Sequence, residues 1–268
     1  MMKTTMDFFC PYGDEKLKRV QSELLEMFTI INEIFKKNQI RFFLAYGSML
    51  GAIRHQGFIP WDDDLDIAVY EEDYEKAVQL LRENLDDKYI VHDKLTDPIY
   101  WCSFSKIRLR NSKTTSHIWL NDNKYKYTGI SIDIYACKKE KVSIFRKKKN
   151  KSKEKALFAV MKFSNQAKLL MKLKALFQTF IPLTIFIFFS ILDKISKKEP
   201  AYLCDPSDLS APMHIDSLFP LKETQFEGVN TLIPARPEAI LTNLYGDYMA
   251  FPPVEKRITH YSSVEFLD

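Results

Sequence analysis

The sequence predicts an α/β fold of the α+β type, in which a mixed sheet packs against helices. Three observations lead to this prediction. A long stretch near the N-terminus repeats its apolar residues at helical spacing, several short apolar runs have the alternation of strands, and two shorter helical stretches separate the first of these runs. Strands interleaved with helices in this order form the sheet core of many globular domains.

Apolar spacing places each element. Leu17, Val20 and Leu24 begin a stripe that recurs every three or four residues, which is typical of an amphipathic helix. The C-terminal part contains a short helical stretch, 237–245, with Gly246 as a natural stop. Helices are therefore expected over 15–38, 49–55, 73–84 and 237–245, and strands over 41–45, 64–70, 89–92, 103–109 and 129–135.

The strand at 64–70 carries the most informative chemistry. Its side chains alternate between two faces, so Asp64 and Asp66 share one face while apolar residues occupy the other. Two carboxylates one pleat apart repel each other unless a cation neutralises them. Mg²⁺, bound through carboxylate oxygens and a substrate phosphate, is the usual solution. The alternative is a solvated acidic loop, which is disfavoured because an apolar strand runs through the acids.

Two further features indicate a metal and phosphate site. Gly47 and Ser48 lie between a strand and the N-terminus of a helix, where free N–H groups favour a phosphate and the serine hydroxyl can donate to it. Asp133 alternates with isoleucines in the strand at 129–135, and it is either a third acid that binds metal and acts as general base or a hydrogen-bonded structural residue. Gly-Ser, then Asp-x-Asp, then a third acid on a neighbouring strand resembles the nucleotidyltransferase superfamily.

Composition indicates a folded protein with an uneven distribution of charge. The 268 residues, 46% of them hydrophobic, suit one large or two small domains. The net charge is +4, but residues 138–199 carry 17 Lys and Arg against 4 Asp and Glu, a net of +13, which leaves 4 − 13 = −9 for the rest. One basic surface and one acidic or metal-requiring surface are expected. Four scattered cysteines without zinc-site spacing favour a reducing, cytoplasmic location.

Residues 138–199 are expected to form a basic helical insertion between a catalytic core at 1–137 and a C-terminal segment at 200–268 that completes the active-site domain. Within the insertion, the stretch 175–192 is apolar but contains Pro182. Three interpretations stay open for it. It forms a buried hairpin broken at the proline, an interfacial attachment to a membrane with basic flanks, or a membrane span.

The stretch GSMLGAIRHQGFIPWDDDLDI, from Gly47 to Ile67, closely resembles the signature of the LicD family, which includes fukutin-like proteins. The resemblance continues in SKIRLRNSKTT (105–115), GISIDIY (129–135) and IPARPEAILTNLYGDYMAFPP (233–253), and it ends with Arg257 and His260. It therefore covers most of the chain outside 138–199. The insertion itself aligns with no motif of the family.

The resemblance implies an enzyme that transfers phosphocholine or a related phospho-alcohol from a CDP-linked donor to a hydroxyl of a cell-surface glycan. It implies metal binding by Asp64 and Asp66. Together with Asp133, these residues are expected to bind one or two Mg²⁺ (or Mn²⁺) ions, which would orient the diphosphate and stabilise charge during in-line transfer. Asp62 and Asp63 belong to the motif and are assigned orienting roles. The acceptor would be a glycan or a lipid-linked glycan.

Basic and aromatic residues complete the expected site. Arg54 and His55, beyond the short helix, are candidates for the donor phosphates, as are Lys106 and Arg108 on a strand. For these four the alternative is an ordinary solvated surface. A choline headgroup requires aromatic walls, because a quaternary ammonium donates no hydrogen bonds. The candidate walls are Trp61, which abuts the acids, and Tyr100, Trp101, Trp119, Tyr245 and Tyr248, with a core role as the alternative for each.

Several functions remain as alternatives. The same chemistry with CDP-ribitol or CDP-glycerol, a nucleotidyltransferase that leaves a nucleotide on its acceptor, and a non-catalytic scaffold all fit the motifs. The expected location is the cytoplasm, at the inner face of the cell membrane, with residues 138–199 in peripheral membrane contact. No specific nucleic-acid partner is expected, since a basic surface alone binds nucleic acid nonspecifically.

Overall fold

A computed structural model describes residues 8–117, 122–146, 148–153, 155, 169–204 and 212–267. The described chain forms two compact units. One comprises 1–138 with 215–268, and the other comprises 139–214. The division of the sequence at 137/138 and 199/200 stays a prediction of domain organisation.

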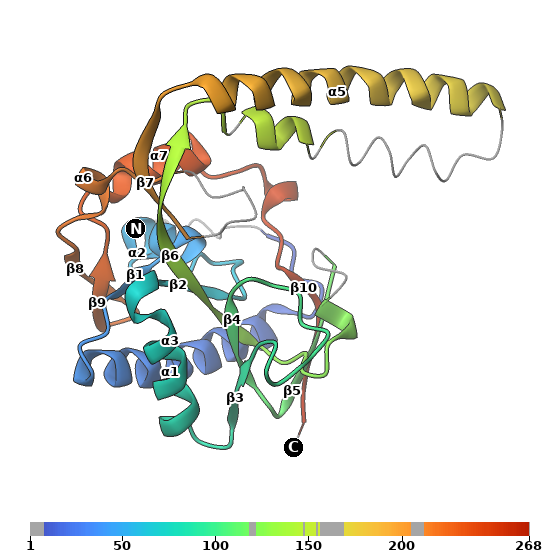
Figure 1. Cartoon of the computed structure of the whole chain (residues 1–268). Coiled ribbons are helices and arrows are strands. Elements are labelled where there is room, and N and C mark those ends of the chain that lie inside the picture. The colour runs from blue at the N-terminus through green and yellow to red at the C-terminus, as the bar shows by residue number, and fades with distance from the viewer. Residues whose placement is uncertain are drawn as a thin grey trace. The chain divides into compact units, whose positions relative to one another are not determined.

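A mixed sheet forms the centre of the first unit (Figure 1). Its strand order is β1-β2-β6-β4-β3; β2 and β6 run parallel, and the other neighbours are antiparallel. This arrangement confirms the predicted α+β class. The strands are β1 (Phe42–Leu44), β2 (Leu65–Tyr70), β3 (Tyr89–His92), β4 (Ser105–Leu109) and β6 (Ser131–Ser143).

Helices α1 (Asp14–Lys37) and α3 (Glu71–Asn84) pack against each other beside this sheet. The apolar stripe expected in α1 is fully buried, and its ends carry acidic residues in the first turn and basic residues in the last turn, which complements the helix dipole. The isoleucines of β2, β6 and β4 are also fully buried, so one face of the sheet supplies the hydrophobic core.

The opposite face of the sheet carries a row of polar side chains. Asp66 of β2 lies beside Asp133 of β6, Asp133 lies opposite Lys106 of β4, and Lys106 lies opposite His92 of β3. Because register fixes which side chains share a face, these four residues lie on one line across the strands. The alternation predicted for Asp66, Lys106 and Asp133 therefore brings them together.

Helix α2 (Tyr46–His55) follows β1 directly. It begins three residues before the expected 49–55, so Gly47 and Ser48 lie in its first turn and not ahead of it. The start was hard to predict because the residue that precedes the helix, Ala45, offers no capping side chain. Helix α7 (Pro237–Tyr245) matches its prediction and ends at Gly246, whose φ of 73° suits glycine.

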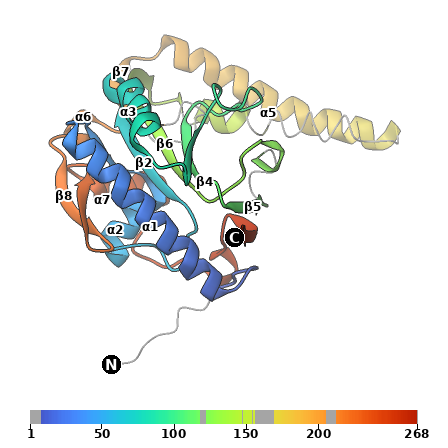
Figure 2. The same ribbon diagram turned by 90° about the horizontal axis from the view of Figure 1, so that it is seen from below.

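Four strands in the described part of the first unit were not expected from the sequence. The strand β5 (Ser112–Ser116) pairs with β10 (Tyr261–Phe266), and Figure 2 shows the C-terminus beside β5. The strands β8 (Lys222–Phe226) and β9 (Val229–Ile233) form a hairpin whose turn, Glu227 and Gly228, has positive φ at both residues. Single helical turns occur at α6 (Ile215–Leu218), η1 (Asp122–Lys124) and η2 (Val254–Lys256).

The second unit contains the long helix α5 (Leu169–Ile195) and the strand β7 (Lys198–Leu203), which pairs with β6. Helix α5 runs through Pro182 without a break, so the interpretation as a hairpin broken at the proline is wrong. Near its C-terminal end, Phe189 contacts Phe145, and Asp193 accepts a hydrogen bond from Lys149. Among the residues that the structure describes, no helix combines the length and apolar character needed to cross a membrane.

Candidate active site

Four aspartates enter the site from the loop before β2 and from β2 itself. Asp63 is completely buried, Asp62 and Asp66 are each 8% exposed, and Asp64 is partly exposed. The chain alternates through this stretch, so neighbouring aspartates point to different surroundings. The acidic run is thus part of the folded core, and the interpretation as a solvated acidic loop is wrong.

Asp63 binds two distant parts of the chain to the start of β2. Its Oδ1 accepts hydrogen bonds from the backbone N–H of His260 at 2.7 Å, and Oδ1 also lies 3.0 Å from His260 Nδ1. Its Oδ2 accepts from the Tyr12 hydroxyl at 2.8 Å and from the Tyr261 N–H at 3.0 Å. Asp63 therefore orients the C-terminal segment toward the acids, while the role in orienting the donor that was expected from the motif stays a prediction.

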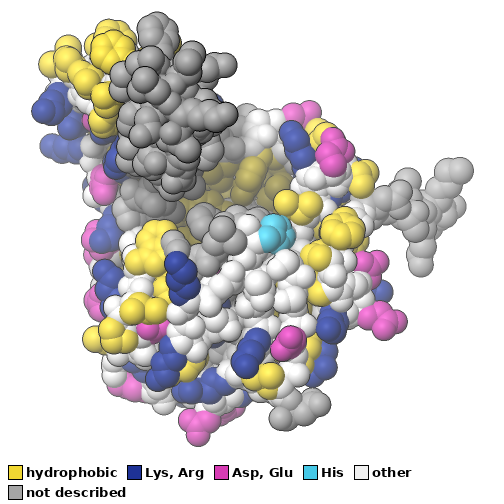
Figure 3. Space-filling view, turned by 90° about the vertical axis from the view of Figure 1, so that its right-hand side faces the viewer, with side chains coloured by type: hydrophobic (Ala, Val, Ile, Leu, Met, Phe, Trp, Pro, Cys, Tyr) yellow, Lys and Arg dark blue, Asp and Glu magenta, His cyan; other side chains and the backbone are white. Residues whose placement is uncertain are grey.

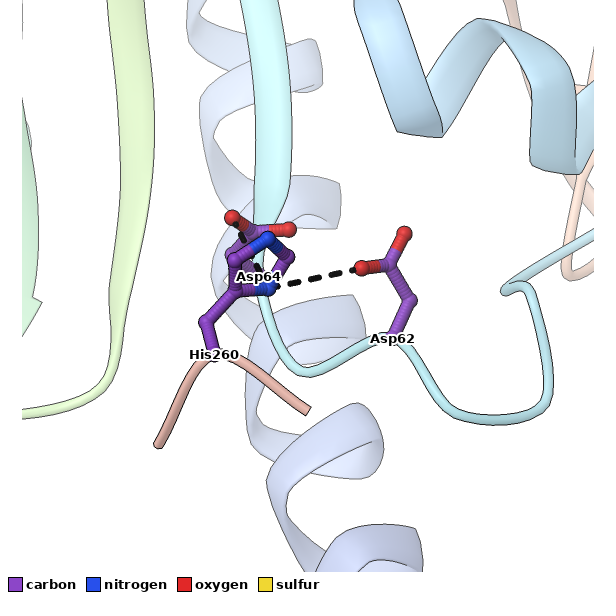
Figure 4. Close-up of side chains that lie close together, drawn as sticks. All are labelled: Asp62, Asp64 and His260. Atoms are coloured by element: carbon purple, nitrogen blue, oxygen red, sulfur yellow. Dashed lines mark ion pairs between the residues drawn. The ribbon is translucent and has the colours of Figure 1, made fainter. Parts of the chain in front are cut away.

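His260 is the residue that this connection brings into the site (Figure 4). Its Nδ1 lies 3.7 Å from Asp62 Oδ1 and 3.5 Å from Asp64 Oδ2. The charge of Asp64 raises the pKa of the imidazole well above its usual value, and the charges of Asp62 and Asp63 add to this effect. Sequence reasoning noted His260 at the end of the family resemblance but gave it no role.

Asp66 and Asp133 lie side by side on neighbouring strands. Burial raises the pKa of Asp66 well above its usual range, and repulsion from Asp64 and Asp133 raises it further. Asp133 is stabilised differently, because Lys106 Nζ donates to both of its oxygens, at 2.8 and 2.7 Å. Asp133 is thus both next to the metal-site candidates and hydrogen-bonded, so the two interpretations of this residue coexist.

The donor set fits a divalent cation. Asp62 and Asp66 are nine-tenths buried, yet within the described residues no N–H or O–H group donates a hydrogen bond to either carboxylate. Burial and repulsion from Asp64 also raise the pKa of Asp62 well above its usual range. Buried carboxylates that repel one another are costly, and oxygen-rich clusters of this kind are what Mg²⁺ or Mn²⁺ bind. That role stays a prediction for Asp64, Asp66 and Asp133.

The Gly-Ser pair supports the acids from helix α2. A Cβ on Gly47 would lie 3.0 Å from Asp62 Oδ2, so glycine allows the carboxylate to approach the helix. Ser48 is buried, and its Oγ accepts a hydrogen bond from the backbone N–H of Asp66 at 2.8 Å. The pair thus fixes the position of β2 relative to the helix N-terminus. Phosphate binding at this turn stays a prediction.

Arg54 and His55 face another part of the chain. Arg54 donates hydrogen bonds to the carbonyl of Tyr248 at 2.7 Å and of Ala250 at 3.4 Å, and its Nε–H donates to His55 Nε2 at 3.0 Å. Burial lowers the pKa of His55 to about 4, and the charge of Arg54 lowers it further. The structure thus connects these two residues to the segment after α7, while their role toward donor phosphates stays a prediction.

Lys106 and Arg108 are buried, so the interpretation as a solvated strand face is wrong for both. Lys106 lies in the site with Asp133, and this carboxylate keeps the pKa of the ammonium above its usual value despite its burial. Arg108 is 1% exposed and donates to His92 Nδ1 at 2.8 Å and to the Gly129 carbonyl at 2.8 Å. Of the two, Lys106 is the cation that the structure brings to the acids.

The aromatic candidates differ in exposure. Trp61 is buried, packs on Phe251 with ring centroids 6.5 Å apart, and lies under the guanidinium of Arg257 at 5.5 Å. Tyr245, at the end of α7, is 46% exposed. Desolvation raises the pKa of its hydroxyl, and the negative charges of the site aspartates, Asp66 first, raise it further. Tyr245 is therefore the aromatic residue that combines an exposed ring with proximity to the acids.

Comparisons with known proteins find one family model and several relatives that agree with each other. Residues 39–131 match the family model described as LicD/FKTN/FKRP, nucleotidyltransferase domain. An uncharacterized protein of Rickettsia prowazekii is 31% identical over 151 residues, which cover 46% of this chain and 55% of that protein. The lipopolysaccharide cholinephosphotransferase LicD of Haemophilus influenzae is 32% identical over 73 residues, 27% of this chain and 28% of that protein. The human ribitol 5-phosphate transferase FKRP is 49% identical over 41 residues, 15% of this chain and 8% of that protein.

The matched segment includes the Gly-Ser turn, the four aspartates and Lys106, whereas Asp133 and His260 lie beyond it. The chain spans about half the length of the first of these relatives and smaller shares of the other two. The family match, the relatives and the signature around β2 agree, and residues 39–131 of this chain match the LicD/FKTN/FKRP nucleotidyltransferase domain.

Proposed function

We propose that this protein is a Mg²⁺-dependent phosphotransferase that moves phosphocholine from CDP-choline to a hydroxyl of a cell-surface glycan, of the teichoic acid, capsule or lipopolysaccharide type. The main support is the row in which Asp66 and Asp133 meet on parallel strands, with Asp64 at the entrance and Lys106 alongside. The carboxylates of Asp62 and Asp66, which are buried and repelled by their neighbours, favour a metal-assisted reaction of a phosphorylated donor.

The proposed reaction balances simply. The acceptor hydroxyl oxygen forms a bond to the phosphorus that carries choline, the bond from this phosphorus to the bridging oxygen of the diphosphate breaks, and CMP leaves. The proton of the hydroxyl passes to a site carboxylate, for which Asp133 is the candidate. A bound Mg²⁺ would neutralise the diphosphate, and Asp64 and Asp66 would hold this Mg²⁺. Lys106 adds positive charge beside Asp133.

The identity of the donor can be tested by comparing three CDP-linked compounds. The relatives include one protein named for choline phosphate transfer and one named for ribitol phosphate transfer, so CDP-ribitol and CDP-glycerol are the alternative donors. The exposed ring of Tyr245 near the acids favours a quaternary ammonium. CMP release from each of the three CDP donors in the presence of a glycan acceptor separates them, and faster release from CDP-ribitol would refute the choline assignment.

Two conservative variants test the mechanism. Asp64→Asn and Asp66→Asn should each abolish CMP release, because each removes a metal ligand. The melting temperature should stay unchanged or rise, because each removes a carboxylate that its neighbours repel. Turnover close to that of the wild type in either variant would contradict the metal assignment. If radiolabel in the cytidine, and not in the choline, appears on the acceptor, the protein is a nucleotidyltransferase instead.

The second unit supports a location at the inner face of the cell membrane. Most apolar side chains in the second half of α5 are exposed, although the helix contacts the rest of its unit through Phe189 and Asp193. Exposed lysines follow at 194, 197 and 198. Apolar residues bordered by lysines match the chemistry of an anionic phospholipid surface. Hydrophobic and basic side chains also lie next to each other at the upper left of Figure 3.

Vesicle binding tests this location. The full chain should co-sediment with vesicles that contain phosphatidylglycerol and less with vesicles of phosphatidylcholine alone. A double substitution, Phe180→Gln with Phe188→Gln, should weaken binding at least about tenfold, since two aromatic side chains supply more than 1.4 kcal/mol of burial. Phe9→Gln is the matched control because Phe9 is exposed outside α5. Equal binding by all three proteins would refute the membrane surface.

A further inference from the structure

The loop between β3 and β4 exposes a group of apolar side chains. Leu95 is 84% exposed, Ile99 60% and Trp101 56%, so three large apolar residues lie in solvent within one short stretch of the chain. Single exposed apolar residues are ordinary on a protein surface, whereas a group of them indicates a surface that contacts something else. These three residues, the loop triad, belong to the first unit, whereas α5 belongs to the second.

Hydrogen bonds within the loop hold the triad outside. Asp93 Oδ1 accepts the backbone N–H groups of Leu95 at 2.9 Å and Thr96 at 3.3 Å, which fixes the turn at the start of the loop. Tyr100, in the same stretch, points inward instead, where its ring centroid lies 4.5 Å from that of His92. The backbone thus directs its polar turn residues and one tyrosine into the unit and leaves the triad on the surface.

Asp97 connects the loop to the chain that follows η1. Its Oδ2 accepts the backbone N–H of Lys126 at 2.7 Å, and its Oδ1 accepts the N–H of Ile99 at 3.3 Å. The backbone N–H of Trp101 also donates to the Tyr125 hydroxyl at 3.4 Å. The two segments therefore build one continuous surface, and the side chains that follow η1 border the triad.

The exposed charges on this surface have one sign. Its two segments are 93–104 and 122–128, and their exposed charged side chains are all lysines, at positions 94, 124 and 126. The acids of these segments, at positions 93, 97 and 122, are buried or half-buried. Each contacts a basic or imidazole side chain of the same unit, namely Arg82, His92 and Arg108 in that order. The surface therefore presents apolar groups and positive charge together.

We propose that the loop triad and these lysines bind the anionic surface of a phospholipid bilayer, with the three apolar side chains in the interfacial layer. Apolar side chains bordered by lysines match such a surface, and tryptophan favours it because its ring is apolar and its N–H is polar. A second protein chain matches the triad less well. Three side chains offer on the order of a few hundred Å², whereas a stable interface buries about 800 Å² on each partner.

This surface goes beyond the location proposed above, which depends on α5 alone. The loop leads directly into β4, which carries Lys106 beside Asp133. Contact with a bilayer at this loop brings the membrane to the unit that carries the acids. The benefit for a lipid-linked acceptor rests on the proposed function, whereas the binding itself does not.

Tryptophan fluorescence of the full chain tests the surface, because α5 contains no tryptophan. Trp61 is buried and Trp119 lies outside the described residues, so Trp101→Phe identifies the signal of Trp101 by difference. With vesicles that contain brominated phosphatidylglycerol, the Trp101 signal should be quenched and should shift to shorter wavelength. Vesicles of brominated phosphatidylcholine alone should quench it much less, because they lack negative charge.

A double variant and a matched control separate the triad from other exposed apolar residues. Leu95→Gln with Ile99→Gln should weaken the vesicle binding that quenches Trp101 at least about tenfold, because it removes two apolar side chains from the interface. Ile215→Gln with Val254→Gln is the control, since it removes two exposed apolar side chains from α6 and η2 of the same unit. The control should bind vesicles as the wild type does.

Lys94→Gln with Lys124→Gln should weaken binding to phosphatidylglycerol vesicles about tenfold or more, and unchanged affinity would refute the role of anionic lipid. Vesicle binding without quenching of Trp101, or equal quenching in Leu95→Gln with Ile99→Gln, would overturn the inference and leave the location at α5 in place. Self-association that this double variant abolishes, without quenching by vesicles, would assign the triad to a second copy of the chain and refute the bilayer.

CMP release with a water-soluble acceptor is measured separately. Leu95→Gln with Ile99→Gln should retain it, because neither residue contacts the acids in the described part of the chain. A chain whose Trp101 is quenched by vesicles but that releases no CMP would support the bilayer surface and refute the proposed function alone. CMP release by a chain whose Trp101 is not quenched would refute the bilayer surface alone.

Discussion

The Asp63→Asn substitution tests whether one buried carboxylate holds the C-terminal segment in the site. Asp63 accepts four hydrogen bonds, two on each oxygen, from Tyr12, His260 and Tyr261. Asparagine keeps one acceptor oxygen and replaces the other by an NH₂ group that faces donors. Two bonds to a charged acceptor are lost, at about 1.5–3 kcal/mol each, so the free energy of unfolding should fall by about 3–6 kcal/mol.

Urea unfolding followed by circular dichroism and tryptophan fluorescence measures this change. The matched control is Asp64→Asn, one residue along the chain. Asp64 is partly exposed, and its closest cationic partner is His260 at 3.5 Å, so this variant should stay within about 1 kcal/mol of the wild type. If Asp63→Asn is as stable as Asp64→Asn, the four hydrogen bonds do not contribute the stability assigned to them. Asp63 then does not hold the C-terminal segment in the site.

Three shorter predictions follow from other contacts. Gly47→Ala brings a methyl group within 3.0 Å of Asp62 Oδ2, so CMP release should fall at least about tenfold while the melting temperature stays within a few degrees of the wild type. Burial and the charge of Arg108 lower the pKa of His92 from 6.5 to about 4. Above pH 6.5 the imidazole is neutral in both the folded and the unfolded chain, so the free energy of unfolding is unaffected. As the pH falls from 6.5 toward 4, only the unfolded chain gains a proton, and the free energy of unfolding should fall by about 3 kcal/mol. Urea unfolding of His92→Gln should therefore depend less on pH over this range. Lys106→Met leaves Asp133 buried without its cation and should cost about 3–5 kcal/mol, with the melting temperature then rising more on addition of Mg²⁺ than it does for the wild type.

Local spacing explains which elements could be predicted. The helix α1 and the strand β2 repeat their apolar residues at periods of about 3.6 and 2, and both were placed to within a residue or two. The pairing of β5 with β10 could not be predicted in this way, because Ser116 and His260 are 144 positions apart. The strand β5 is short and polar, and a shift of register between Tyr261 and Ser263 interrupts the alternation of β10.

The candidate site shows the same limit at the level of single residues. Alternation correctly put Asp66 and Asp133 on the side of their own strands away from the isoleucines, since this depends only on the strand period, whereas their meeting depends on the register. It could not show that Arg108 is buried, because His92 and Gly129, which accept its hydrogen bonds, are distant in the sequence. Likewise nothing in three consecutive aspartates distinguishes the one that becomes fully buried. Burial is set by the chain that packs on top.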